Sequence, residues 1–85
     1  MPKFKKKPVI VEAIQWNGDN LDEVDKFIGN PHDWFYNKNS RKVLTIRTFE
    51  GYTDADLHDW IIKGTAGEFY PCKPDIFKEI YESVK

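Results

Sequence analysis

Residues 60–85 constrain the fold most, because they combine two strand-like runs, a glycine-containing turn and an amphipathic helix. Residues 60–62 form one run of large β-branched or aromatic side chains, and residues 68–70 include a second. Residues 64–67 lie between these runs and carry two glycines, which accept the positive φ angles of tight turns. The pattern predicts a β-hairpin.

Two prolines mark the end of this hairpin and the start of a helix. Pro71 has no amide hydrogen, so the second strand either ends near it or lies at a sheet edge. Pro74 suits the first helical position, and Asp75 places a negative charge near the positive end of the helix dipole. The apolar residues that follow share one helical face: Ile76, Phe77, Ile80, Tyr81 and Val84. We expect this face to pack on a sheet.

Length and composition describe one small domain with an aromatic-rich core. The 85 residues leave room for one core, so residues 1–85 form a single domain and residues 1–7 a basic N-terminal arm. Three Trp, four Tyr and six Phe let few side chains bury a large area. A formal net charge of -1 gives no overall attraction to nucleic acid, although the lysines of the arm leave a local phosphate contact open.

The sequence also favours a cytoplasmic protein. Cys72 is the single cysteine, so an intramolecular disulfide and a cysteine-built metal site are both excluded. The chain has no apolar run near the length of a membrane span, and residues 1–7 lack the apolar segment of a signal peptide. We therefore expect a cytosolic location and no membrane association.

The first strand is predicted at residues 9–16, where both faces are largely apolar, as in a central or doubly covered strand. Glu12 interrupts this pattern. If it points the same way as Ile10 and Ile14, it is expected either to be at least partly buried with a raised pKa or to pair with a Lys or Arg, and the pair is the preferred interpretation. A short helix is predicted at residues 21–28, with Asn20 and Glu23 at capping-box spacing and Gly29 as its C-cap.

Three further strands are predicted at residues 34–36, 43–49 and 52–55, joined by polar or glycine-containing turns. The element order is therefore β-α-β-β-β-β-β-α. We predict an α+β fold with five or six strands in a twisted, mainly antiparallel sheet, in which the first strand pairs with the 60–70 hairpin and both helices cover one face. A partly closed barrel is the alternative.

The sequence contains no catalytic constellation, and we expect neither an enzyme nor a bound metal or cofactor. His32 and His58 lie in turns without metal-ligand spacing, and Cys72 has no nucleophile signature around it. The acidic residues of the 54–59 turn lack the calcium-loop pattern, so a solvated acidic turn is the preferred interpretation.

Two binding sites are candidates. The corner between the last strand and the last helix, at residues 70–75, could hold an anion or nucleotide through Lys63, Tyr70 and Lys73. Alternatively, aromatic side chains of residues 34–36, above all Trp34 and Tyr36, could stack on bases or bury in a partner protein. For both sets, the competing interpretation is that the aromatic rings fill the core.

Two segments, KKKPVIVEAIQWNGDN and DWIIKGTAGEFYPCKPDIFKEIYE, resemble a family of small proteins from tailed phages and prophages of bacteria. The family has no established activity, and residues 29–42 match it little. This chain has His58-Asp59 where the family usually has Gly-Asp. The resemblance implies expression in a bacterial cytoplasm and favours an accessory protein that binds a host or phage protein; a small-ligand or nucleotide-binding domain is the alternative.

Overall fold

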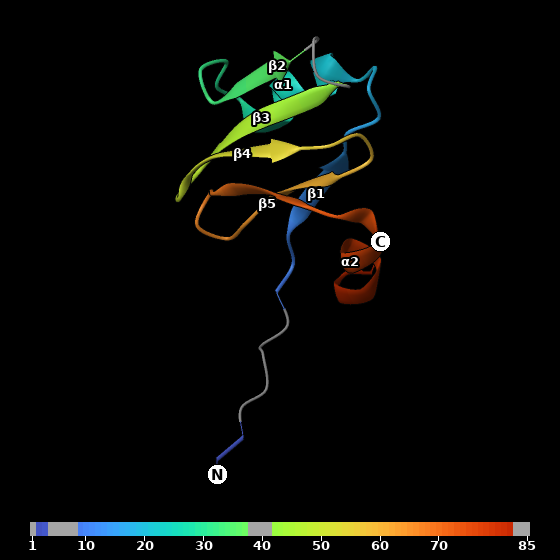
Figure 1. Cartoon of the computed structure of the whole chain (residues 1–85). Helices are drawn as coiled ribbons and strands as arrows, with labels where there is room; N and C mark the ends of the chain where they lie inside the picture. The colour runs from blue at the N-terminus through green and yellow to red at the C-terminus, as the bar shows by residue number, and fades with distance from the viewer. Residues whose placement is uncertain (1, 4–8, 38–41, 83–85) are drawn as a thin grey trace.

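The computed structural model describes residues 2–3, 9–37 and 42–82. These residues form the elements in the predicted order (Figure 1): β1 (Glu12–Gln15), α1 (Leu21–Ile28), β2 (Trp34–Asn37), β3 (Val43–Thr48), β4 (Gly51–Ala55), β5 (Trp60–Lys63), β6 (Phe69–Cys72) and α2 (Pro74–Ile80). The predicted α+β class is therefore confirmed. Most of the basic arm and residues 38–41 and 83–85 lie outside the described residues. The final helix is shorter than the predicted dozen residues, because α2 ends at Ile80 and Tyr81 is extended.

The strands form two antiparallel three-stranded sheets, ordered β1-β5-β6 and β2-β3-β4. No ladder joins the two sheets among the described strands, so the barrel alternative is not formed. Pairing of the first strand with the last hairpin is confirmed, since Ala13 lies opposite Ile62.

β1 is shorter than predicted and lies at an edge of its sheet, so the expectation of a central strand was wrong. Val9 and Ile10 precede it with 49% and 78% of their surfaces exposed. Glu12 is also exposed, rather than buried, and Lys63 lies opposite it on β5. An apolar sequence on both faces therefore did not identify a doubly covered strand here.

The core lies between α1, the inner face of the β2-β3-β4 sheet and one face of the β1-β5-β6 sheet. Its buried members come from all three: Trp16, Val24, Ile28, Leu44, Ile46, Ala55 and Ile61. Phe27 of α1 and Phe69 of β6 meet edge to face at its border, with ring centroids 5.6 Å apart. The predicted alternation in β3 is confirmed, because Leu44 and Ile46 are buried and Arg47 is exposed.

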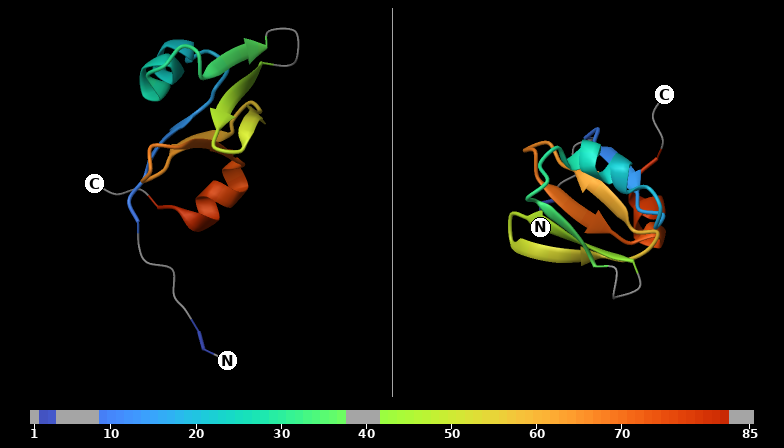
Figure 2. Two further views of the ribbon diagram at one scale, coloured as in Figure 1. Left: turned by 90° about the vertical axis from the view of Figure 1, so that its left-hand side faces the viewer. Right: turned by 90° about the horizontal axis from the view of Figure 1, so that it is seen from above.

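α2 packs on the opposite face of the β1-β5-β6 sheet (Figure 2). Phe77 stacks on Trp60, with ring centroids 4.2 Å apart and planes 8° from parallel. Side chains alternate along a strand, so Trp60 points away from the core that Ile61 joins. The prediction that both helices cover one face was therefore wrong, because apolar side chains on both faces of β5 call for cover on each side.

α1 begins and ends where predicted, but its N-terminus is not held by the predicted capping box. Asn20 occupies the N-cap position without a side-chain cap hydrogen bond. Instead its Nδ2 donates to the Gln15 carbonyl at 2.8 Å and to Glu23 Oε1 at 2.6 Å, which ties the helix to the end of β1. The predicted C-cap is confirmed, since Gly29 has φ 79° and its N–H donates to the Asp25 carbonyl.

Proline and glycine define the β5–β6 hairpin as expected. Pro71 lies in β6, which is an edge strand, so its missing N–H breaks no ladder hydrogen bond. Gly67 takes φ 82° in the turn. Gly64 has a different role, because a Cβ at this position would collide with the Glu68 carboxylate.

We predict that Phe77→Ala destabilises the protein by about 2–3 kcal/mol, somewhat below the cost for a fully buried Phe, because Phe77 is only partly buried on Trp60. The matched control is Ile76→Ala on the same helix, where the side chain is 47% exposed and the loss should stay within about 0.5 kcal/mol. Urea denaturation followed by Trp fluorescence measures both. Equal losses would contradict the docking of α2 through Phe77.

Candidate functional site

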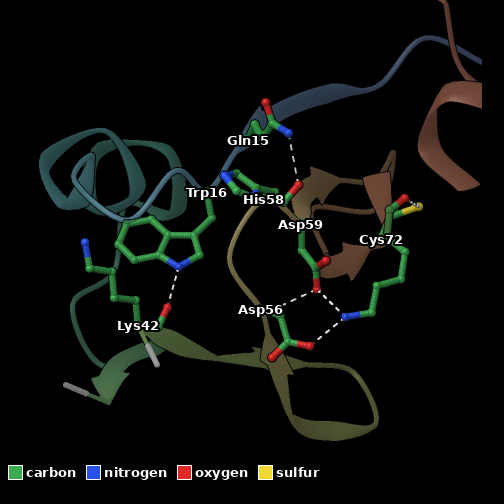
Figure 3. A network of polar contacts seen from close by, with 8 residues as sticks. Gln15, Trp16, Lys42, Asp56, His58, Asp59 and Cys72 are labelled. Carbon is green, nitrogen blue, oxygen red and sulfur yellow. Dashed lines mark hydrogen bonds and ion pairs between the residues drawn. The ribbon is translucent and has the colours of Figure 1, made fainter. Parts of the chain in front are cut away.

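Asp59 is a buried carboxylate at the end of the loop between β4 and β5. Its surface is 2% exposed, and its Oδ2 accepts hydrogen bonds from the Asp56 N–H and from Lys73 Nζ, both at 2.9 Å (Figure 3). The expectation of a solvated acidic turn was therefore wrong for Asp59. A buried carboxylate needs partners to offset its lost hydration. Asp56 supplies one from the same loop, and Lys73, the residue between β6 and α2, supplies the other.

Lys73 completes this group, which we call the Asp59 cluster (Asp56, Asp59 and Lys73). Lys73 Nζ also contacts Asp56 Oδ2 at 2.7 Å. The hydrogen bonds to Asp56 and Asp59 raise the pKa of Lys73 above its usual value, because both favour the ammonium form. The cluster therefore joins the end of β6 to the loop after β4, and its cation is already bound by two carboxylates.

The same loop is held to the end of β1 by backbone hydrogen bonds. The His58 N–H donates to the Trp16 carbonyl at 2.7 Å, and the Trp16 N–H donates to the Asp59 carbonyl at 2.9 Å. Gln15 Nε2 donates to the His58 carbonyl at 3.0 Å (Figure 3). His58 takes φ 76°, the left-handed conformation that glycine adopts more easily.

The predicted corner site is not assembled by the fold. Lys73 is bound within the Asp59 cluster, and Lys63 is exposed at the end of β5. Lys63 lies opposite Phe69, whereas Tyr70 lies opposite Ile62, so Lys63 and Tyr70 point to opposite faces of the sheet. Asp75 adds a negative charge in the first turn of α2. These positions do not bring the three side chains onto one ligand.

Two groups of β6 have raised pKa values. Burial, followed by the hydrogen bond with the Tyr81 hydroxyl at 3.4 Å, raises the pKa of Tyr70 to about 12. Burial is also the main cause of the raised pKa of Cys72, with smaller contributions from Asp59 and Asp75. Raised pKa values keep the phenol and the thiol protonated at neutral pH, so neither group is poised as a nucleophile.

Residues 34–36 divide between the two faces of the β2-β3-β4 sheet. Trp34 and Tyr36 are partly buried and pack against the core, and Tyr36 meets Trp16 edge to face at 5.9 Å. Trp34 Nε1 donates to Asp25 Oδ1 at 3.2 Å. Phe35 points the other way and is 52% exposed. Of these three aromatic residues, Phe35 therefore presents the most exposed ring.

Phe35 belongs to an exposed aromatic patch that the sequence analysis did not single out. Its ring lies 5.6 Å from that of Tyr52, which is 58% exposed on β4. Thr45 and Arg47 of β3 share this side of the sheet, and Thr45 Oγ1 donates to Asp54 Oδ1 at 2.8 Å. We call these five residues the outer face. Strand register could have identified Phe35 as exposed. Thr45 lies on the polar side of β3, and Phe35 pairs with Thr45, so it lies on the same side.

No group of three or more His, Cys, Asp or Glu side chains within the described ranges could hold a metal ion. Residues 2–3, 9–37 and 42–82 contain no helix that is both long and apolar enough to cross a membrane.

Comparison with known proteins gives no match: no family model, curated protein or solved structure is significantly similar to this chain. The resemblance to small phage proteins therefore stays a prediction from the sequence.

We predict that Asp59→Ala destabilises the protein by about 2–4 kcal/mol, because it leaves the Asp56 N–H without its acceptor and Lys73 with Asp56 as its one remaining acceptor. Asp59→Asn retains an oxygen that can accept from the Asp56 N–H and should lose about half as much. Lys73→Met should lose at least as much as Asp59→Asn, because it leaves the buried Asp59 carboxylate without its cation. Chemical denaturation measures the free energy of unfolding of all three variants. An Asp59→Ala variant as stable as the unmodified protein would contradict the structural role of Asp59.

The raised pKa of Tyr70 predicts that this tyrosine ionises late in an alkaline titration. Its folded pKa of about 12 exceeds the ordinary value of 10, so its contribution to stability is complete below pH 10 and is lost as the pH rises toward 12. Absorbance titration at alkaline pH should show one tyrosine ionising later than an ordinary tyrosine. Tyr70→Phe should remove that late step, whereas Tyr52→Phe, on the outer face, should leave it in place. A Tyr70→Phe titration that keeps the late step would overturn the assignment.

Proposed function

We propose that this protein acts without catalysis, by binding a partner protein through its outer face. The observation that carries the proposal is the contact of Phe35 with Tyr52, two rings that remain more than half exposed on a regular antiparallel sheet. Exposed aromatic rings on a rigid surface lose little conformational freedom when a partner buries them. Tyrosine and arginine, here Tyr52 and Arg47, are enriched among the residues that dominate binding energy at interfaces.

The charges of the outer face favour a protein over a nucleic acid. Arg47 is the cation of the face, and its Nη1 lies 3.7 Å from Asp33 Oδ1, so its charge is partly compensated. Asp54 adds a carboxylate beside the aromatic rings. A formal net charge of -1 adds no general attraction to phosphate. Base stacking on Phe35 and Tyr52 would therefore lack the electrostatic contribution that nucleic-acid binders use.

The resemblance to small phage and prophage proteins supports the cellular setting of this proposal. In that setting the partner is a host or phage protein in the bacterial cytoplasm. The alternative of a small-ligand or nucleotide-binding domain at residues 70–75 has less support, because Lys73 is bound by two carboxylates and Lys63 faces away from Tyr70.

The test is an affinity purification from nuclease-treated bacterial lysate with the tagged protein and two variants. Phe35→Ser combined with Tyr52→Ser should lower capture of a stoichiometric partner at least about tenfold, since residues that dominate an interface contribute roughly 2 kcal/mol or more. The matched control is Ile80→Ser on α2, which is as exposed as Tyr52 at 58%. α2 lies on the other sheet, away from β2 and β3 (Figure 1). It should capture the partner normally.

Two results would contradict the proposal. In one, the double variant retains the partner that the unmodified protein captures, which would place the interface elsewhere. In the other, a parallel purification from untreated lysate recovers only nucleic acid or a small molecule and no partner protein. Thermal melting of each variant confirms that lost capture does not reflect unfolding.

A further inference from the structure

β4 presents a free edge with outward-pointing backbone groups. The Arg47 N–H donates to the Asp33 carbonyl, so Thr45 and Arg47 of β3 direct their backbone groups toward β2. In an antiparallel ladder the alternate residues face the other neighbour, and residues 44, 46 and 48 therefore bond to β4. Their partners are residues 51, 53 and 55. The N–H and C=O groups of Tyr52 and Asp54 consequently point away from β3, at the edge of the sheet.

The edge of β6 is less suited to accept another strand. The Gly64 N–H donates to the Glu68 carbonyl, so the alternation places the backbone groups of Tyr70 and Cys72 toward β5 and those of Phe69 and Pro71 toward the edge. Pro71 has no N–H, which interrupts the row of donors. β4 is therefore the edge of these two that offers complete pairs of donors and acceptors.

An acidic groove lies beside β4 on the inner side of the β3–β4 hairpin. It has a volume of about 360 Å³ and is lined by residues that include Phe49, Glu50, Thr53, Glu68, Phe69 and Pro71. The lining contains two carboxylates, no basic side chain and several apolar surfaces. Phe49 is 76% exposed at the hairpin tip. The groove thus fits a segment that carries both basic and apolar side chains.

We propose that this edge binds residues 3–11 of a second copy of the chain as an added strand, in the register that turns Pro8, which has no N–H, away from β4. This segment contains four lysines together with Phe4, Val9 and Ile10, and the last two are strand-forming side chains that the fold leaves exposed. Backbone pairing with Tyr52 and Asp54 supplies the affinity, and the lysines meet Glu50 and Glu68.

A second copy, rather than the same chain, supplies the strand. The described chain just before β1 leads away from β4 (Figure 1). Exchange of the segment between two copies satisfies both edges at once, as a closed two-fold assembly requires. Direct pairing of two β4 edges is less favourable, because it brings acidic residues of both copies together, among them Asp54 and Glu50.

The first experiment is sedimentation velocity on the full chain and on a variant that lacks residues 3–8. The full chain should form dimers at concentrations below about 1 mM, with weaker association at high salt. The shortened variant should stay monomeric. A full chain that remains monomeric at about 1 mM would overturn the proposal, and so would a shortened variant that still dimerises, because the latter result indicates direct edge pairing.

The second experiment locates the contact with a synthetic peptide of residues 2–11 added to the shortened variant. Amide hydrogen exchange followed by NMR should slow at Tyr52 and Asp54, whose N–H groups point outward. The amide of Thr53 is the internal control, since it already bonds to β3. Unchanged exchange at Tyr52 and Asp54 under saturating peptide would overturn the added strand.

Charge reversal then tests the groove. Glu50→Lys combined with Glu68→Lys should weaken peptide binding at least about tenfold, and a peptide with glutamate in place of its lysines should regain affinity for this variant. Glu79→Lys combined with Glu82→Lys is the matched control, because both residues are exposed in or just after α2. It should bind the original peptide normally. Equal binding by both double variants would overturn the role of Glu50 and Glu68.

Discussion

Burial of the Asp59 carboxylate is the constraint on which the rest of this structure depends. A charge that is 2% exposed is tolerated only with close partners, and its partners come from the loop after β4 and from the residue that precedes α2. Satisfying Asp59 therefore fixes the end of β6 against the end of β4. The backbone bonds between residues 58–59 and Trp16 add β1 to the same junction. One loop thus sets the relation between the two sheets.

This junction also explains why the β1-β5-β6 sheet is covered on both faces. Ile61 points to the core with α1, and Trp60 points to the ring of Phe77 on α2. The chain enters α2 directly after Lys73, so the cluster that anchors Lys73 also aims the helix at Trp60. α2 has no buried residue of its own, and a seven-residue helix is marginal without such contacts. Its position follows from the cluster and the stacked rings together.

Two parts of the β2-β3-β4 sheet remain exposed outside the core, the outer face and the edge of β4. The inner side of the β2-β3-β4 sheet is buried in the core, whereas Phe35 and Tyr52 on the outer face are exposed. The edge of β4 is independent of this face, because its backbone groups lie in the plane of the sheet and the aromatic rings stand above it. A partner on the outer face and a strand at the edge would therefore bind side by side.

The sequence by itself determined the local structure. Periodicity and turn residues located α1, the hairpins and the start of α2, because helix stripes, strand alternation and the backbone preferences of glycine and proline act over a few residues. Only the tertiary structure decided what depends on distant neighbours: the edge position of β1, the cover of opposite sheet faces by α1 and α2, and the separation of Lys63 from Tyr70. The burial of Asp59 belongs to this second group, since its main cationic partner lies 14 residues away. Exposure of Phe35 was likewise fixed by register, which pairs it with Thr45 across strands.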